Sequence, residues 1–269
     1  MDDKAELLPF LKWAGGKRWF LKYKEIFVPP FSGKYLEPFL GGGAVYFSLR
    51  PSKAVISDSN PDLIEAYMAI RDNPVELEVL LKKHHVLHSK EYYYQVRGLV
   101  PSSSIERAAR FIYLNRTCWN GLYRVNLKGE FNVPMGTKTN VIYEGENFVD
   151  LSAALKRAKI MVCDFEETFK KARCGDFMFV DPPYTVKHNN NGFVKYNESI
   201  FSWSDQERLK RCVDKAVARG VKVLVTNANH DSINELYGDY ERLPMERASV
   251  ISGSARHRGI YNELIIRCW

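Results

Sequence analysis

The sequence lacks the cysteine patterns that mark disulfide-rich or zinc-binding proteins. Its 269 residues include five cysteines, an odd number, and no C-x-x-C motif occurs. A disulfide framework and a zinc site are therefore both disfavoured, and a reducing compartment is expected. The five scattered positions are Cys118, Cys163, Cys174, Cys212 and Cys268.

Long apolar segments are also missing. No stretch approaches the roughly 20 apolar residues of a membrane-spanning helix. The first residues, MDDKAELLPF, are acidic and lack the basic-then-apolar order of a signal peptide. We therefore expect a cytoplasmic protein with no membrane partner. The hydrophobic fraction of 45% and the charged fraction of 26% are ordinary for a globular protein.

Acidic residues are too few to balance the basic ones. The chain has 39 lysines and arginines against 32 aspartates and glutamates, a net charge of +7. The excess is local, because residues 102–140 contain six basic and two acidic residues. One such residue is ordinarily a solvated surface charge, but a local excess beside aromatic residues favours contact with a phosphate backbone. The six basic residues are Arg107, Arg110, Arg116, Arg124, Lys128 and Lys138.

The order of the predicted elements indicates an α/β fold. Residues 33–49 predict a strand, a glycine-rich turn and a helix, and residues 54–57 predict a second strand before a helix that starts at Asn60-Pro61. This alternation favours a mostly parallel sheet with right-handed crossovers. Further strands are expected at 159–163, 177–180, 221–229 and 261–269, and a further helix is expected with a capping box of Ser204 and Glu207 and a C-cap at Gly220.

A mainly helical segment interrupts the α/β pattern. From about Asn73 to Ser152 apolar residues recur at helical spacing, and the interruption can begin as early as Pro61. Lys128-Gly129 lies between two short extended arms, which predicts a hairpin at about 122–134. We therefore expect an α/β domain formed by residues 1–60 and 151–269, with a domain inserted at 61–150.

The stretch DFMFVDPPYTVKHNNNGF, residues 176–193, has the features of a binding site. Asp181 ends a short apolar strand, and Pro182 and Pro183 prevent its continuation because they have no amide hydrogen. A plain strand-to-loop turn is the simplest interpretation. The segment also offers a carboxylate, a proline carbonyl and the ring of Tyr184, which together suit a planar base with an exocyclic amine. The two acceptors would hold the amine hydrogens, and the ring would stack on the base.

Glycines and aspartates at other strand ends predict a nucleoside-type cofactor. FLGGGA, residues 39–44, lets the backbone approach a ligand, although it is not G-x-G-x-x-G and a structural turn explains it equally well. Asp58 lies 17 positions after Gly41 and suits ribose hydroxyls. Ligands of parallel α/β sheets bind at the carboxyl ends of strands, so Asp58, Asp164, Asp181 and the glycine loop should converge on one crevice.

Four motifs, in this order, resemble those of the Dam-type DNA adenine-N6 methyltransferases. They are KWAGGK (12–17), EPFLGGG (37–43), NRTCWNGLYRVNLKGEFNVPMG (115–136) and DPPY (181–184). The resemblance covers nearly the whole chain. It implies a class I methyltransferase fold, which is Rossmann-like, with S-adenosylmethionine as methyl donor. It also implies that the insertion is a target-recognition domain and that the target is GATC in double-stranded DNA.

The resemblance also assigns roles to individual residues. Asp181, Pro182, Pro183 and Tyr184 would form the catalytic motif, with Asp181 on the target amine and Tyr184 stacked on the target adenine. Cofactor contacts are implied for Trp13, Lys17, Phe39, Gly41, Gly43, Asp58, Asp164, Phe165 and Asp181. DNA contacts are implied for Trp119, Asn120, Leu122, Arg124 and Pro134, and further basic contacts are expected from Arg116, Lys128, Lys138, Arg256 and Arg258. A solvated turn explains Arg256 and Arg258 about as well.

Several alternatives stay open on the residues alone. The same acceptors would suit N4 of cytosine or an RNA base, and a DNA-binding protein that has lost catalysis is a rival of another class. An intact glycine loop, Asp58 and DPPY argue against that rival. His84 and His88 have the spacing of two metal ligands on a helix, but no H-E-x-x-H motif and no third ligand accompany them, so we expect a surface pair and no metal. We expect a monomer, associated with the nucleoid through DNA.

Overall fold

The computed structural model describes residues 7–126, 128–186, 201–248 and 260–269. The chain forms two compact units of three segments each. The first unit consists of Met1–Lys22, Leu40–Ser52 and Asp58–Val162, and the second consists of Tyr23–Phe39, Lys53–Ser57 and Cys163–Trp269. The predicted insertion at 61–150 therefore lies wholly within the first unit, which also takes in segments from the predicted α/β domain.

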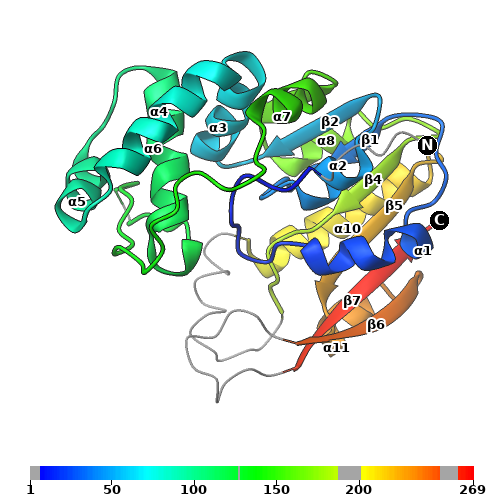
Figure 1. The fold of residues 1–269 in the computed structure, drawn as a ribbon. Helices are drawn as coiled ribbons and strands as arrows, with labels where there is room; N and C mark the ends of the chain where they lie inside the picture. Colours follow the sequence, from blue (N-terminus) through cyan, green and yellow to red (C-terminus); the bar gives the residue numbers. More distant parts are fainter. Residues whose placement is uncertain (1–6, 127, 187–200, 249–259) are drawn as a thin grey trace. The chain divides into compact units, whose positions relative to one another are not determined.

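The first unit is mainly helical (Figure 1). Its helices begin at residues suited to capping: Asn60 Oδ1 accepts a hydrogen bond from Leu63 N at 3.1 Å, and Ser89 Oγ accepts one from Tyr92 N at 3.1 Å. The elements are η1 (Arg18–Tyr23, which ends in the second unit), α2 (Ala44–Leu49), α3 (Pro61–Asp72), α4 (Pro74–Leu87), α5 (Lys90–Gly98), α6 (Ser104–Thr117), η2 (Trp119–Gly121), α7 (Phe148–Leu155) and β3 (Ala158–Val162).

The core of the first unit explains why it extends beyond the predicted insertion. Helix α3 packs against both α6 and α7. Tyr67 of α3 contacts Phe10 edge-on, with ring centroids 4.8 Å apart, and stacks on Phe47 of α2 at 6.1 Å. The hydroxyl of Tyr46, also in α2, donates to Ala154 O of α7 at 2.6 Å. Apolar burial thus joins the N-terminal segment and α2 to the helices of the insertion.

Among the described residues the sheet has seven strands in the order β3-β2-β1-β4-β5-β7-β6. β3 lies in the first unit, and the other six belong to the second, except that Asp58 at the end of β2 is in the first. β1 is parallel to β2 and β4, and β4 is parallel to β5, whereas β7 is antiparallel to β5 and β6. The prediction of an α/β fold with a mostly parallel sheet is therefore confirmed. The six strands are β1 (Tyr35–Glu37), β2 (Ala54–Asp58), β4 (Phe177–Val180), β5 (Lys222–Ala228), β6 (Glu241–Ala248) and β7 (Ile260–Cys268).

Among the strands that the structure describes, β6 is the one that the sequence analysis missed. It lies at an edge of the sheet and pairs with β7. It contains Pro244 and exposes Glu241 and Glu246, so it has no clear apolar alternation. Edge strands tolerate proline and charged side chains because one side of the strand forms no ladder, and such strands are hard to predict from sequence.

Helix α10 (Trp203–Val217) begins two residues earlier than predicted. Its capping box is formed by Ser202 and Asp205: Ser202 Oγ accepts from Asp205 N at 3.2 Å, and Asp205 Oδ2 accepts from Ser202 N at 2.9 Å. The predicted box of Ser204 and Glu207 is wrong because the pattern occurs twice, two residues apart. The C-cap is Ala218, and Gly220 lies two residues beyond it with φ of 81°. The other helices here are α1 (Lys24–Phe27), α8 (Phe165–Phe169) and α11 (Asp231–Leu236).

The segment expected to form a hairpin makes short antiparallel contacts. Val125 and Phe131 form an antiparallel bridge, and Asn126 N donates to Glu130 O at 2.9 Å. Asn126 Oδ1 accepts hydrogen bonds from Lys128 N and from Glu130 N, and these side-chain bonds stabilise the turn. Gly129 supplies the positive φ of 79° that the turn requires.

Candidate active site

The D-P-P-Y segment leaves strand β4 directly, as expected. Asp181 follows the last residue of β4, and its Oδ1 accepts a hydrogen bond from Thr226 Oγ1 at 2.7 Å. Thr226 is a buried residue of the neighbouring strand β5. The hydroxyl of Tyr184 donates to Glu263 Oε2 of β7 at 3.0 Å. Burial, together with the negative charges of Asp181 and Glu263, raises the pKa of Tyr184 well above its usual value, so Tyr184 remains a donor.

A buried amide pair supports the two prolines. Gln206 Nε2 of α10 donates to Pro183 O at 3.2 Å, and Gln206 Oε1 accepts from Asn227 Nδ2 of β5 at 3.1 Å. Both amide side chains are fully buried. The Pro183 carbonyl is therefore occupied, whereas the described residues provide no hydrogen bond to the Pro182 carbonyl. Asp181 and Pro182 thus present two acceptors close together in the chain.

Aromatic rings gather at the segments that follow β1 and β3. Phe39 stacks on Phe165, with ring centroids 5.4 Å apart and planes at 28°. Phe201 contacts both rings, at 5.6 Å and 5.8 Å. Phe165 is buried and begins α8, directly after Asp164. Two residues expected at the cofactor, Phe39 and Phe165, are therefore in contact within the second unit.

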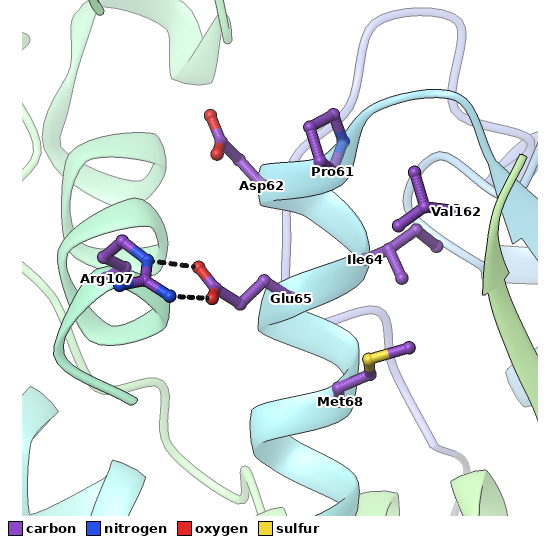
Figure 2. A pocket seen from close by; sticks show the side chains of 7 residues that line it. All are labelled: Pro61, Asp62, Ile64, Glu65, Met68, Arg107 and Val162. Carbon is purple, nitrogen blue, oxygen red and sulfur yellow. Dashed lines mark hydrogen bonds and ion pairs between the residues drawn. The ribbon is translucent and has the colours of Figure 1, made fainter. Parts of the chain in front are cut away.

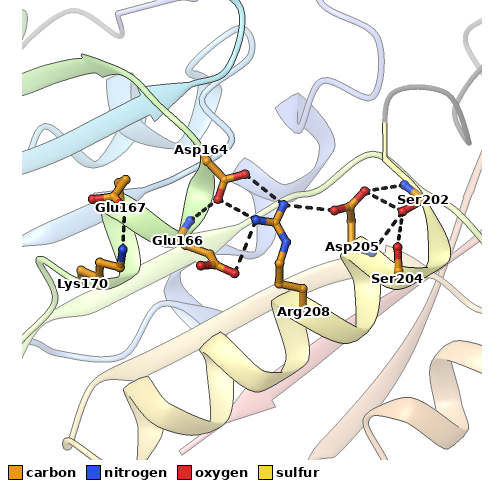
Figure 3. A network of polar contacts seen from close by, with 8 residues as sticks. All are labelled: Asp164, Glu166, Glu167, Lys170, Ser202, Ser204, Asp205 and Arg208. Carbon is orange, nitrogen blue, oxygen red and sulfur yellow. Dashed lines mark hydrogen bonds and ion pairs between the residues drawn. The ribbon is translucent and has the colours of Figure 1, made fainter.

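Asp164 belongs to a network of charged side chains (Figure 3). Arg208 of α10 pairs with both of its carboxylate oxygens, at 3.1 Å and 2.9 Å. The same guanidinium lies 4.3 Å from the centroid of the Phe165 ring. Because Gln206 and Arg208 are two residues apart, the first turns of α10 contact both the D-P-P-Y segment and the Asp164-Phe165 pair.

In the first unit, the glycine loop is bound to Asp58. Gly41 N donates to Asp58 Oδ2 at 3.0 Å, Asn60 N donates to Asp58 Oδ1 at 3.0 Å, and Tyr67 OH donates to Gly41 O at 2.9 Å. Burial raises the pKa of Asp58, and the backbone donors oppose this rise. Gly41 has φ of 48°, and a Cβ atom there would lie 2.7 Å from Trp13 Cδ1. The loop therefore excludes any side chain at Gly41.

The K-W-A-G-G-K segment is held by helix α6 and by Tyr123. Asn115 of α6 accepts a hydrogen bond from Lys12 N at 3.0 Å and donates to Lys12 O at 2.8 Å. The ring of Trp13 stacks on Tyr123, with centroids 5.6 Å apart. Lys17 is buried, and its Nζ donates to Gly15 O at 2.6 Å, so it is not the surface lysine that a simple turn would carry. Trp13, Gly41 and Asp58 therefore share one neighbourhood of the first unit.

The residues expected to contact DNA are mostly accessible. Trp119 is 50% exposed, and Asn120 next to it is exposed with an unusual φ of 57°. Arg124 is exposed on the hairpin, where its Nε donates to Asn132 Oδ1 at 2.8 Å. Leu122 is half-buried. The remaining exposed members of the set are Lys128, Pro134 and Lys138.

Arg116 differs from the other residues expected to contact DNA, and the prediction that it contacts DNA has to be corrected. It is 1% exposed, and its guanidinium donates to Phe10 O, to Val141 O and to both carboxylate oxygens of Glu146. These bonds use all five of its N–H donors. Arg116 therefore stabilises the interior of the first unit and has no donor left for a phosphate. Arg256 and Arg258 lie outside the described residues.

The histidine pair is part of an aromatic cluster and not a plain surface pair. His84 stacks on Tyr113 at 4.7 Å, and its Nδ1 lies 2.8 Å from the hydroxyl of Tyr92. His88 Nδ1 lies 2.8 Å from the hydroxyl of Tyr113. Tyr93 is fully buried, whereas Tyr94 beside it is 40% exposed. Within the described ranges, no group of histidine, cysteine or acidic side chains has the arrangement of metal ligands, and no helix is long and apolar enough to cross a membrane.

A pocket on the first unit contains none of the expected site residues (Figure 2). Glu65 and Arg107 form a bidentate ion pair across it, with Arg107 Nε 2.9 Å from Glu65 Oε2. These two charges satisfy each other, and the rest of the lining is apolar except for Asp62. We assign the pocket no role. Its lining residues are Pro61, Asp62, Ile64, Glu65, Met68, Arg107 and Val162.

Sequence reasoning missed the residues that hold the expected site residues in place. Thr226 and Asn227 carried one usable signal, because two polar residues end the apolar run VKVLV. Arg208 and Gln206 lie among many polar residues of an amphipathic helix, where nothing distinguishes them. The missed residues are Asn115, Gln206, Arg208, Thr226, Asn227 and Glu263.

The chain is similar to known proteins over nearly its whole length. The family model for D12 class N6 adenine-specific DNA methyltransferases matches residues 13–251. The type II methyltransferase M1.LlaDCHI of Lactococcus lactis subsp. cremoris is 39% identical over 273 residues, which cover 98% of this chain and 96% of that protein. M.MjaIII of Methanocaldococcus jannaschii is 37% identical, covering 97% and 99%, and a DNA adenine methylase of Vibrio cholerae is 30% identical, covering 95% and 94%. The chain therefore belongs to the D12 class of N6 adenine-specific DNA methyltransferases, and its α/β fold is that of a class I methyltransferase.

Proposed function

We propose that the protein transfers a methyl group from S-adenosylmethionine to N6 of an adenine flipped out of duplex DNA, within the sequence GATC. The observation that carries the proposal is the D-P-P-Y turn after β4. There, Asp181 and the Pro182 carbonyl offer two acceptors, and Tyr184 offers an aromatic ring. The adenine amine has two hydrogens for those acceptors. In a duplex this amine is engaged in base pairing, so the base has to leave the stack before it can react.

The two acceptors supply what the adenine amine lacks as a nucleophile. Its lone pair is delocalised into the ring, which makes the nitrogen flat and weakly reactive. Hydrogen bonds from both amine hydrogens to Asp181 and Pro182 favour a pyramidal nitrogen and stabilise the positive charge that develops on it. Thr226 holds the Asp181 carboxylate in place at 2.7 Å. S-adenosylmethionine supplies a methyl group on a positively charged sulfur, so no covalent intermediate with the protein is needed.

Each unit, taken by itself, contains residues that suit part of a nucleoside cofactor. The Asp58 carboxylate accepts backbone hydrogen bonds from Gly41, Asn60 and Ser59, and a carboxylate has about four acceptor positions, so it retains capacity that suits a ribose hydroxyl. Gly43 has φ of 67°, and a Cβ atom there would lie 2.6 Å from Tyr67 OH, so the loop keeps this shape only with glycine at position 43. Asp164 and Phe165 offer an acceptor and a buried ring for the purine. We propose cofactor contacts for Trp13, Lys17, Phe39, Gly41, Gly43, Asp58, Asp164, Phe165 and Asp181.

We propose that residues 61–150 form the target-recognition domain and that the hairpin near 122–134 enters the DNA groove. The half-exposed ring of Trp119 is a flat wedge that can enter the space left by a flipped base. The exposed guanidinium of Arg124 suits the O6 and N7 acceptors of a guanine. Asn120, Leu122 and Pro134 would contact bases, Lys128 and Lys138 would contact phosphates, and one copy of the chain would act alone.

The test is to replace Asp181 by alanine and by asparagine. We expect methylation of GATC duplexes to fall by about 10²–10³, because a preorganised acceptor for the amine is lost. DNA affinity should be largely unchanged. Asp239→Asn is the matched control, because the Asp239 side chain is 88% exposed and lies away from the turn in sequence. An Asp181→Ala variant with turnover near that of the wild type would contradict the proposal.

A second measurement identifies the base and its sequence. DNA from cells that express the protein is sequenced with modification-sensitive reads. We expect N6-methyladenine within GATC. Modified adenine in another sequence would contradict the proposed target, and modified cytosine would contradict the proposed chemistry.

A further inference from the structure

Arg208 holds Asp164 more firmly than a single surface ion pair would. Its NH1 and NH2 donate to Asp164 Oδ1 at 3.1 Å and Oδ2 at 2.9 Å, a bidentate arrangement (Figure 3). NH2 also donates to Asp205 Oδ1 at 3.0 Å, and Glu166 Oε1 lies 3.4 Å from NH1. Asp205 is itself held by the capping box with Ser202. The guanidinium is therefore preorganised by three carboxylates before any ligand binds.

The acceptor capacity of Asp164 differs between its two oxygens. Oδ1 accepts from Arg208 NH1 and also from Glu166 N at 2.9 Å, because Asp164 is the N-cap of α8. Oδ2 accepts from Arg208 NH2 alone among the described residues. A carboxylate oxygen accepts about two hydrogen bonds, so Oδ1 is saturated and Oδ2 retains one place. The Asp164 side chain is 45% exposed, which leaves that place accessible to a ligand.

We propose that Arg208 is a positioning residue that fixes the Asp164 carboxylate and directs Oδ2 at the exocyclic amine of the cofactor's purine. This inference rests on the proposed function, in which Asp164 and Phe165 bind that purine. An ionised carboxylate accepts hydrogen bonds and cannot donate them. The site therefore favours a purine with a 6-amino group. It disfavours one with a 6-oxo group, because the purine oxygen and Asp164 Oδ2 are both acceptors and would lie against each other.

Arg208 also fixes the ring that would lie beside the purine. Its guanidinium lies over Phe165 at 4.3 Å, while Phe39 stacks on Phe165 at 5.4 Å. One side chain thus sets the direction of the acceptor and the position of the ring. Lysine has a single ammonium group, so it cannot reproduce a planar fork that binds two oxygens and stacks on a ring.

The test compares the binding of S-adenosylhomocysteine and S-inosylhomocysteine, which differ at the purine 6-position, by calorimetric titration. We expect the wild type to prefer the amino compound by at least about tenfold, as for a hydrogen bond to a charged group. Asp164→Ala should abolish the preference. Arg208→Gln should reduce it severalfold, Arg208→Lys should be intermediate, and Arg208→Gln should have no further effect when Asp164 is already alanine.

Two controls separate positioning from general stability. Arg211→Gln changes an exposed arginine of the same helix and should preserve both affinities. If Arg208→Gln weakens both compounds equally while Asp164→Ala abolishes the preference, Arg208 only stabilises the fold and the inference is wrong. If Asp164→Ala keeps the full preference, the purine binds elsewhere, and the proposed cofactor contact fails together with the inference.

Discussion

The hydroxyl of Tyr184 donates a hydrogen bond to Glu263 Oε2 across 3.0 Å, which joins the turn after β4 to strand β7. Glu263 is 2% exposed, so its acceptor is fixed in the interior of the sheet. The bond holds the tyrosine ring from its far end. The position of the ring is therefore set before any base arrives.

Two replacements of Tyr184 should distinguish the contribution of its ring to methylation from the contribution of its hydroxyl group. Tyr184→Phe keeps the stacking surface and loses the bond to Glu263, so we expect a moderate loss of methylation and a lower melting temperature. Tyr184→Ala removes the ring, and stacking of a base on an aromatic side chain contributes about 1–3 kcal/mol. Turnover should therefore fall about tenfold or more in the alanine variant. Equal losses in the two variants would show that the hydroxyl, and not the ring, matters.

Trp13→Ala and Asp58→Ala should both weaken cofactor binding. Trp13 contacts the glycine loop, and Asp58 binds Gly41 N at 3.0 Å and is the proposed acceptor for the ribose. We expect the dissociation constant of S-adenosylhomocysteine to rise about tenfold or more for Asp58→Ala, as for lost hydrogen bonds to a charged group. Titration calorimetry measures this. Asp72→Asn, an exposed aspartate at the end of α3, is the control. Unchanged affinity in both variants would place the cofactor elsewhere.

Arg124 should read a base, whereas Lys128 should contact phosphate. The bond from Arg124 to Asn132 uses Nε, so the outer end of the planar fork can face a guanine. Arg124→Ala should cost about 1–3 kcal/mol on GATC and relax discrimination at one base pair. Lys128→Ala is the matched comparison on the same hairpin. It should weaken all duplexes about equally and reduce the salt slope by about one charge.

Methylation rates on GATC and on duplexes with one changed base pair, at two salt concentrations, distinguish the two roles. If Arg124→Ala lowers the rates uniformly and flattens the salt dependence, Arg124 binds only the backbone. The guanine contact would then lie in another residue of the insertion.

His84 should make stability depend on pH. Burial against Tyr113 lowers the pKa of His84 to about 4, below the unfolded value of about 6.5. Between these values the unfolded chain binds a proton that the folded chain does not, so the free energy of unfolding falls as the pH falls. The loss approaches about 3 kcal/mol near pH 4.

Urea unfolding measures this dependence when it is carried out between about pH 4.5 and pH 7. This range includes the unfolded histidine pKa of about 6.5. His84→Gln should reduce the slope, because glutamine does not titrate, and part of the remaining slope comes from His88, whose pKa burial also lowers. A slope unaffected by His84→Gln would show that another group titrates.

The sequence alone determined the features that depend on neighbouring residues. Pro182 and Pro183 cannot continue a strand, so D-P-P-Y had to follow β4. Alternating strand and helix signals predicted the mostly parallel sheet, and a long interruption of that alternation predicted the inserted helices. The start of α10 was predicted wrongly because the local sequence allows two capping boxes, one beginning at Ser202 and one at Ser204, and does not decide between them.

Only the tertiary structure decided which distant side chains meet. Tyr184 and Glu263 are 79 residues apart, Arg208 and Asp164 are 44 apart, and Arg116 and Phe10 are 106 apart. The sequence around Arg116 resembles a basic DNA-contacting segment, but the folded chain surrounds Arg116 with carbonyls and the Glu146 carboxylate. An arginine on a helix can face water or the interior. Which one it faces depends on the segments that pack against that helix, because a buried charge is tolerated only where they bring partners for all its donors.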